Sequence, residues 1–89
     1  MRAVITVIGK DIVGILAKVS TECALVNINI IEVTQSVLQD LFAMIMLVDI
    51  SKSKIEFSEF VDKMNTLSQK ENLNIQVMHE DIFNCMHKI

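Results

Sequence analysis

Residues 3–14 read AVITVIGKDIVG, and this stretch indicates the first two elements of the fold. Its first six residues are apolar and largely β-branched, which predicts a buried strand that Gly9 and Asp11 end. From Val13 to about Leu25, apolar side chains recur at helical spacing and predict a first helix. Asn27 follows, and Asn tolerates the positive φ that commonly ends a helix. The chain therefore begins with a strand, a glycine-containing turn and a helix.

Two strands are expected after this helix. The first covers about residues 29–38, where apolar and polar side chains alternate, and residues 39–40 are the expected turn. The next strand covers residues 41–50 and is apolar at every position from 41 to 48. An antiparallel strand with one wet face would alternate, so this run predicts cover on both faces and favours a partner subunit.

The second half of the chain predicts another helix and another strand. Apolar residues from Phe57 to Leu67 mark an amphipathic helix of about four turns, capped by Ser58 or the residues just before it. A fourth strand is expected from Leu73 to about His79. A short C-terminal helix follows, with Asp81 as its cap.

The order βαββαβ predicts an α+β, ferredoxin-like sandwich, in which a four-stranded antiparallel sheet carries two helices on one face. Right-handed crossovers place strands one and three in the centre of the sheet. With no Pro, two Gly and no linker, residues 1–89 are expected to form a single domain with its core in residues 3–79 and a tail in residues 80–89.

Composition narrows the function classes. A net charge of −3 argues against direct nucleic-acid binding, which depends on basic side chains, and no apolar run is long enough to span a membrane. Apolar residues make up 52% of the chain, more than one small core requires, which favours a homodimer. Cys23 and Cys85 form no CxxC pair, so reduced thiols and a cytoplasmic location are expected, with Cys23 packed as a small hydrophobe.

The turn at residues 9–14 has the chemistry of a small anion site. A turn that opens a helix directs unpaired N–H groups and the positive end of the helix dipole at one point. Gly9 allows a sharp exit from the strand, and Gly14 allows close approach of the helix to its neighbours. Asp11 has two uses, as a helix cap or as a carboxylate for a ligand ammonium group.

The sequence contains neither the P-loop ending nor the third glycine of the dinucleotide fingerprint, and no cofactor is expected. A zwitterion fits the mixed charges of the turn better. The plain alternative is that Asp11 only caps the helix and the glycines only turn the chain.

Residues 9–16, GKDIVGIL, closely resemble the G-x-D-x-x-G-I-L/V signature of the ACT domain. Residues 27–30, NINI, resemble the family's G-x-N-I segment, with Asn27 in place of the usual glycine. The resemblance spans about residues 3–79. The tail, from HEDIF to MHKI, resembles that of stand-alone bacterial ACT proteins similar to the glycine cleavage system transcriptional repressor.

This resemblance implies a dimer, formed through sheets or helices, that binds an amino acid at its interface near the first loop. It implies ligand contacts from the helix start and two polar side chains: Asp11, Ile12, Val13, Gly14, Ile15 and Asn29. Asn29 is expected to lie near the turn, and a partner's residues to close the site.

The sequence gives less support for a metal site or a catalytic site. His79, Glu80, Asp81 and His87 contain metal-ligand types, but strand neighbours diverge, so no metal site is expected. No nucleophile and base are paired in the sequence, so no enzyme activity is expected. Two functions stay open: a small-molecule-binding regulatory domain acting through a partner protein, and a ligand-free dimerisation or adaptor protein.

Overall fold

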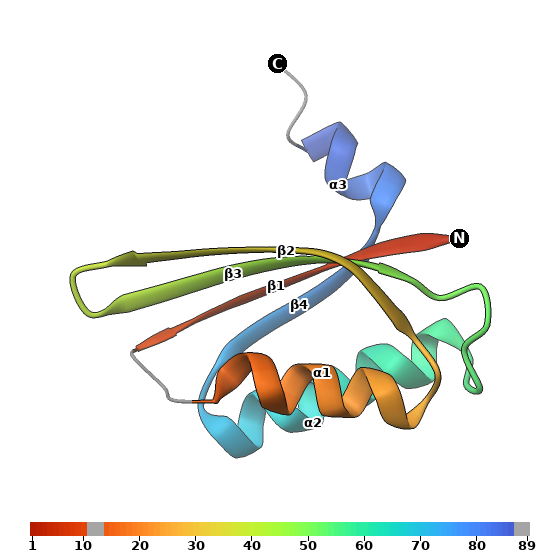
Figure 1. Cartoon of the computed structure of the whole chain (residues 1–89), viewed down its shortest axis with the longest axis horizontal. Helices are drawn as coiled ribbons and strands as arrows, with labels where there is room; N and C mark the ends of the chain where they lie inside the picture. Colours follow the sequence, from red (N-terminus) through yellow and green to blue (C-terminus); the bar gives the residue numbers. More distant parts are fainter. Residues whose placement is uncertain (11–13, 87–89) are drawn as a thin grey trace.

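The computed structural model describes residues 1–10 and 14–86, and this part of the chain contains four strands and three helices (Figure 1). In chain order they are β1 (Arg2–Lys10), α1 (Ile15–Leu25), β2 (Asn29–Leu38), β3 (Leu41–Asp49), α2 (Phe57–Glu71), β4 (Asn74–His79) and α3 (Glu80–Met86). The strands pair antiparallel in the order β2-β3-β1-β4. The expected ferredoxin-like sandwich is confirmed, with strands one and three in its centre.

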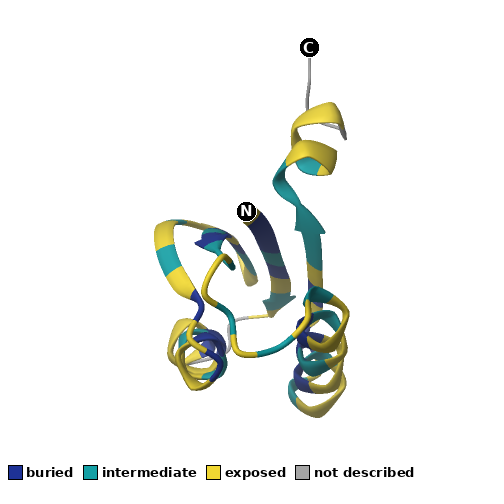
Figure 2. Ribbon diagram, turned by 90° about the vertical axis from the view of Figure 1, so that its right-hand side faces the viewer, coloured by how far each residue is buried: buried dark blue, intermediate teal, exposed yellow. Residues whose placement is uncertain are grey.

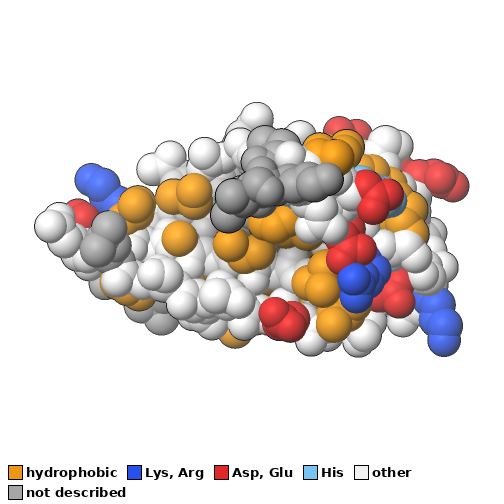
Figure 3. Space-filling view, turned by 90° about the horizontal axis from the view of Figure 1, so that it is seen from above, with side chains coloured by type: hydrophobic (Ala, Val, Ile, Leu, Met, Phe, Trp, Pro, Cys, Tyr) orange, Lys and Arg blue, Asp and Glu red, His pale blue; other side chains and the backbone are white. Residues whose placement is uncertain are grey.

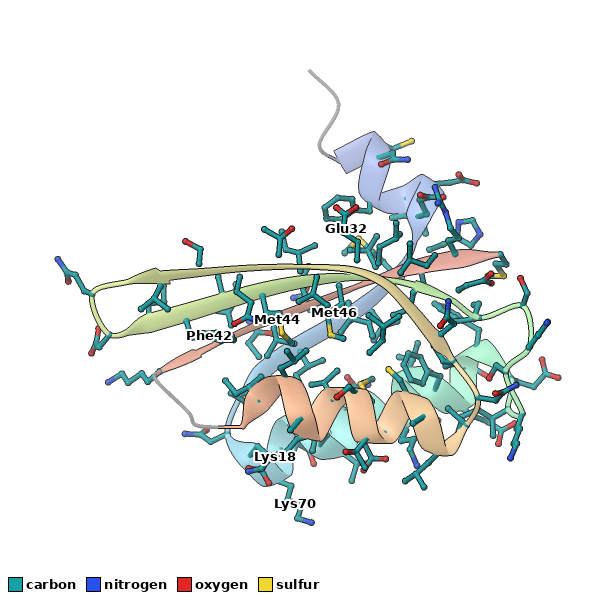
Figure 4. The ribbon with its side chains drawn as sticks, in the orientation of Figure 1. Lys18, Glu32, Phe42, Met44, Met46 and Lys70 are labelled. Atoms are coloured by element: carbon teal, nitrogen blue, oxygen red, sulfur yellow. The ribbon has the colours of Figure 1, made fainter. Side chains whose placement is uncertain are left out.

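One face of the sheet carries α1 and α2, and α3 rises on the other side (Figure 2). Side chains that alternate on the central strands, such as Ile5, Val7 and Met46, are fully buried against the two helices together with Phe60 and Met64. Figure 4 shows Met44 and Met46 directed toward the helices and Glu32 directed to the opposite side. This helix-covered face is the hydrophobic core.

The apolar run of β3 divides between the two faces. Met44, Met46 and Val48 point into the core, whereas Ile45 lies on the other face and is 43% exposed. We call that second side the open face; α3 lies against β1 and β4 there. Figure 3, which views the molecule from this side, shows hydrophobic side chains gathered over the sheet. A single chain therefore covers this strand fully on one face only, and the expected cover of the second face by a partner subunit stays a prediction.

The turns after the first helix and after the second strand lie where the sequence predicts them. Asn27 (φ 62°) follows α1, Gln39 (φ 57°) forms the β2–β3 turn, and Asn72 (φ 55°) ends α2. The sequence offers Ser58 or the residues just before it as the cap of α2; Ser58 lies inside the helix, and Glu56, just before it, is the N-cap residue. The Glu56 N–H donates to Glu59 Oε1 at 3.3 Å, which satisfies a group that lacks a partner within the helix.

Two predicted boundaries near the first turn need correction. Strand β1 continues past Gly9 to Lys10, and Gly9 pairs with Phe42 of β3, so Gly9 does not turn the chain out of the strand. Helix α1 begins at Ile15, directly after Gly14 in a left-handed conformation. Residue 13, the predicted helix start, lies outside the described residues.

The C-terminal helix is confirmed as α3, but Asp81 is not its cap. The helix begins at Glu80, and the Asp81 N–H donates to His79 Nδ1 at 3.1 Å, so His79 takes the capping role. Arg2 donates two hydrogen bonds to the carboxylate of Glu80. This bidentate pair fastens the start of α3 to the start of β1. The last three predicted helical residues, 87–89, lie outside the described residues.

Candidate ligand-binding site

Gly14 is the residue that sets the start of α1. Its φ of 82° costs any residue with a Cβ about 1–2 kcal/mol, and its carbonyl accepts the Lys18 N–H at 2.9 Å. Apart from its neighbours along the chain, none of the described residues lies within 4 Å of a Cβ built at Gly14. The expected close approach is thus absent within this part of the chain, and the glycine is explained by its φ.

The other predicted residues of the turn differ in what they can offer a ligand. Ile15 is buried in the core, so only its backbone is available at the start of α1. No side chain caps α1 among the residues that the structure describes. Asp11, Ile12 and Val13 lie outside the described residues, and their roles stay predictions.

A hollow of about 460 Å³ lies at the end of β1, between this strand, the start of β3 and the α2–β4 turn. Its lining includes Lys10 of β1, Leu41 of β3, and Asn72 and Asn74 on either side of the α2–β4 turn. Lys10 supplies a cation and the two asparagines supply amide groups, which suits a small ligand with a carboxylate.

Lys10, Asn72 and Asn74 received no ligand role in the sequence analysis. The signal for them was present, because the predicted topology pairs β4 with β1 and so places the α2–β4 turn beside the end of β1. The observed register, Ile8 opposite Asn74, has this geometry. An ion pair between Lys18 of α1 and Glu71 at the end of α2 holds the two helices together at the same end of the sheet.

Asn29 lies at the opposite end of the sheet. Asn29 pairs with Asp49 of β3, and Asp49 pairs with Arg2 at the start of β1. Gly9 is seven residues after Arg2 on the same strand, so Arg2 and Gly9 are about 23 Å apart at ~3.3 Å per residue. The prediction that Asn29 lies near the turn is therefore wrong within one chain. A strand of this length keeps its two ends apart whatever the side chains are.

Asn29 nevertheless lines a hollow of its own, with a volume of about 390 Å³. Asn27, Asp49 and Lys52 also line it, so an amide pair, a carboxylate and an ammonium group share one small space. Hydrogen bonds from the Ser51 hydroxyl and the Ser51 N–H hold the pKa of Asp49 below its usual range. This carboxylate stays ionised at neutral pH.

The two cysteines differ sharply. Burial raises the pKa of the Cys23 thiol to about 11, with a smaller contribution from Glu22. A protonated thiol in the core is a poor nucleophile, as expected for a packing residue. Cys85 is exposed on α3. Within residues 1–10 and 14–86, no group of three or more His, Cys, Asp and Glu side chains is arranged to hold a metal ion.

The fold and the glycine-containing turn define a class of small regulatory domain. The family model described as the ACT domain matches residues 2–78. This chain belongs to the ACT domain family, a regulatory fold that generally binds small molecules. Among its relatives, the UPF0237 protein CPE1496 of Clostridium perfringens is 47% identical over 89 residues, which are all of both chains. The chain is thus a member of the UPF0237 group of ACT domain proteins.

Solved structures agree with this assignment. An ACT domain protein from Streptococcus pneumoniae is 36% identical, superposes with a TM-score of 0.81, and is matched over 93% of both chains. A putative glycine cleavage system transcriptional repressor is 26% identical with a TM-score of 0.72, over 85% of this chain and 43% of that one. No helix in the part of the chain that the structure describes is long and apolar enough to cross a membrane.

Proposed function

We propose that this protein is a cytoplasmic homodimer that binds an amino acid, or a related small carboxylate, at the start of α1 and passes the signal to a partner protein. The observation that carries the proposal is the left-handed Gly14, which opens α1 without a side-chain cap among the described residues. The first-turn N–H groups lack intrahelical partners and favour an anion.

The ligand chemistry follows from the groups around this helix start. A carboxylate accepts hydrogen bonds from the N–H groups of the first turn and pairs with Lys10 at the neighbouring hollow. The ammonium group of an amino acid pairs with the carboxylate of Asp11, as the family signature implies. Both charges of a zwitterion are then neutralised, which a simple anion site does not achieve.

The second half of the site comes from another copy of the chain. Strand β2 is an edge strand, with α1 packed beside it. If two copies pair antiparallel along β2 about a two-fold axis, the Asn29 end of one copy lies beside the Leu38 end of the other. The Leu38 end of β2 lies at the end of the sheet where α1 begins. The Asn29 hollow of the partner therefore approaches Gly14.

The surface of this edge supports such pairing. Leu25 of α1 and Val37 of β2 are 61% and 62% exposed, and Ile31 is also exposed. The ten residues of β2 include no Pro or Lys, the residues that commonly protect an edge strand from pairing. A dimer along β2 would bury these apolar side chains and also complete the site.

Calorimetry with each common amino acid tests the proposal. We expect saturable heat for at least one of them, and an Asp11→Ala variant to bind that ligand at least about tenfold more weakly, because a charged hydrogen bond is lost. Asp62→Ala is the matched control, since Asp62 is exposed on α2, and it should bind normally. No heat with any amino acid would reject this function.

A ligand-free dimerisation or adaptor protein is the second candidate. The φ of Gly14 is consistent with this candidate as well, because the backbone geometry alone accounts for a glycine at that position. A ligand that binds the folded state raises the melting temperature by mass action. A thermal-shift screen that is flat across amino acids and small carboxylates would therefore support the adaptor.

A further inference from the structure

A third hollow lies on the open face, beside α3. It has a volume of about 330 Å³, which is within the range of small-molecule sites. Residues on three strands and α3 line it, among them Thr6, Ala43, Ile45, Gln76, Met78 and Phe83. The hollow is thus bounded by the sheet on one side and by the helix on another.

The lining is apolar except for two neutral groups. Thr6 and Gln76 are register partners on β1 and β4, so the hydroxyl and the amide share one side of the hollow. Among residues 1–10 and 14–86, no charged side chain lines it. A zwitterion would lose its hydration here without gaining a charged partner, which is unfavourable.

The remaining lining favours a flat, aromatic ligand. Phe83 presents a ring and Met78 a thioether, and both groups interact favourably with aromatic rings. The bidentate pair between Arg2 and Glu80 fastens α3 at this position, so the hollow has a fixed boundary. A bare sheet face suits another protein surface, whereas a bounded hollow suits a small molecule.

We propose that this hollow is a second ligand site, specific for a neutral aromatic molecule with one hydrogen-bonding group. The ring packs between Ile45 and Phe83, and the polar group bonds to Thr6 or Gln76. The site is separate from the start of α1, so it does not depend on the amino-acid site.

Indole is a suitable probe, because it is neutral, aromatic and carries one N–H donor. The chain contains no Trp and no Tyr, so the fluorescence of indole can be followed without background from these residues. We expect a saturable blue shift of indole emission as the protein is added. Absence of saturation would overturn the proposal.

Two matched pairs of variants locate the binding. Ala43→Leu fills the hollow and should abolish the shift, whereas Ser36→Leu, opposite Ala43 on β2 and outside the lining, should preserve it. Thr6→Val should weaken indole binding about three- to tenfold, because it removes a hydroxyl from the lining. Thr34 pairs with Ile45 from β2, as Thr6 does from β1, so Thr34→Val is the control and should leave indole binding unchanged. Equal effects within either pair would contradict the assignment.

Further controls keep the result interpretable. If circular dichroism shows that Ala43→Leu is unfolded, the smaller Ala43→Val replaces it, with a weakening in place of a loss. Asp11→Ala should leave indole binding unchanged, so failure of the amino-acid site and failure of this site are distinguishable. If light scattering shows that Ile45→Glu dissociates a dimer and the wild type binds no indole, a second copy covers the open face and the proposal is wrong.

Discussion

The two faces of the sheet use the same alternation of side chains with different outcomes. On the helix-covered face, Met46 is fully buried beneath α1 and α2, whereas its neighbour Ile45 on the open face keeps 43% of its surface. Figure 4 shows the two helices only on the side to which Met46 points. The comparison teaches that an apolar residue of a strand marks a core position only where helices cover its face of the sheet.

Thiol reactivity should show the largest difference between the two sides. Cys23 is fully buried with a pKa raised to about 11, and Cys85 is exposed on α3. At pH 8 we expect Cys85 to react with a thiol reagent at least about a thousandfold faster, because Cys23 is reached only when the core opens. Urea should remove the difference. Similar rates in the native protein would contradict the burial of Cys23.

The Cys23 thiol should make the free energy of unfolding depend on pH in the alkaline range. The folded-state pKa of Cys23 is raised from about 9 to about 11, so between these values the unfolded state binds fewer protons than the folded state. The free energy of unfolding should therefore fall as the pH rises from 9 to 11. Urea unfolding of wild type and Cys23→Ser across this range measures it; a slope that is identical in both would exclude Cys23 as the cause.

Truncation of adjacent residues on β3 compares the faces directly. Met46→Ala should lower the free energy of unfolding by about 2–5 kcal/mol, because it leaves a cavity in the core. Ile45→Ala should cost about 1 kcal/mol, since much of its side chain is exposed already. Urea unfolding at one protein concentration gives both values. Equal losses would mean that the open face is sealed in solution.

Ion pairs should give the smallest effects. Lys63 Nζ lies 2.9 Å from Glu22 Oε2 and links α2 to α1, and both side chains are partly exposed. We expect Glu22→Gln to cost about 1 kcal/mol or less, and the difference to disappear in about 1 M NaCl.

On the open side, Glu80→Gln should instead lower the amide protection of α3, which hydrogen exchange detects, while the core strands keep theirs. Loss of protection in the core as well would mean that α3 supports the whole fold.

Element order and sheet topology were predictable because periodicity and turn chemistry agree along the chain. Asn27 and Gln39 adopt the positive φ expected for turns, and β2 has the predicted bounds. The residues that cap the helices were less predictable. Ser58 resembles a cap by residue type, yet the helix begins one residue earlier after Glu56, and an imidazole rather than Asp81 caps α3. Several side chains compete for such positions, and packing selects one.

The site was only partly predictable, since its residues combine across the fold. Gly14 could be found from the signature, but Lys10 and Asn74 become neighbours only through the pairing of β1 with β4. Asn29 was placed beside the turn because it resembles a family position, although strand register puts it at the far end of the sheet. Sequence similarity identifies such residues without specifying which copy of the chain supplies them.

Subunit mixing tests the composite site most directly. Asp11→Ala and Asn29→Ala homodimers should each bind the amino-acid ligand weakly, because every site lacks one group. After unfolding and refolding together in equal amounts, half of the dimers are mixed and each mixed dimer has one intact site, so calorimetry should recover about a quarter of the wild-type sites. No recovery in mixed dimers would contradict a site shared between two copies.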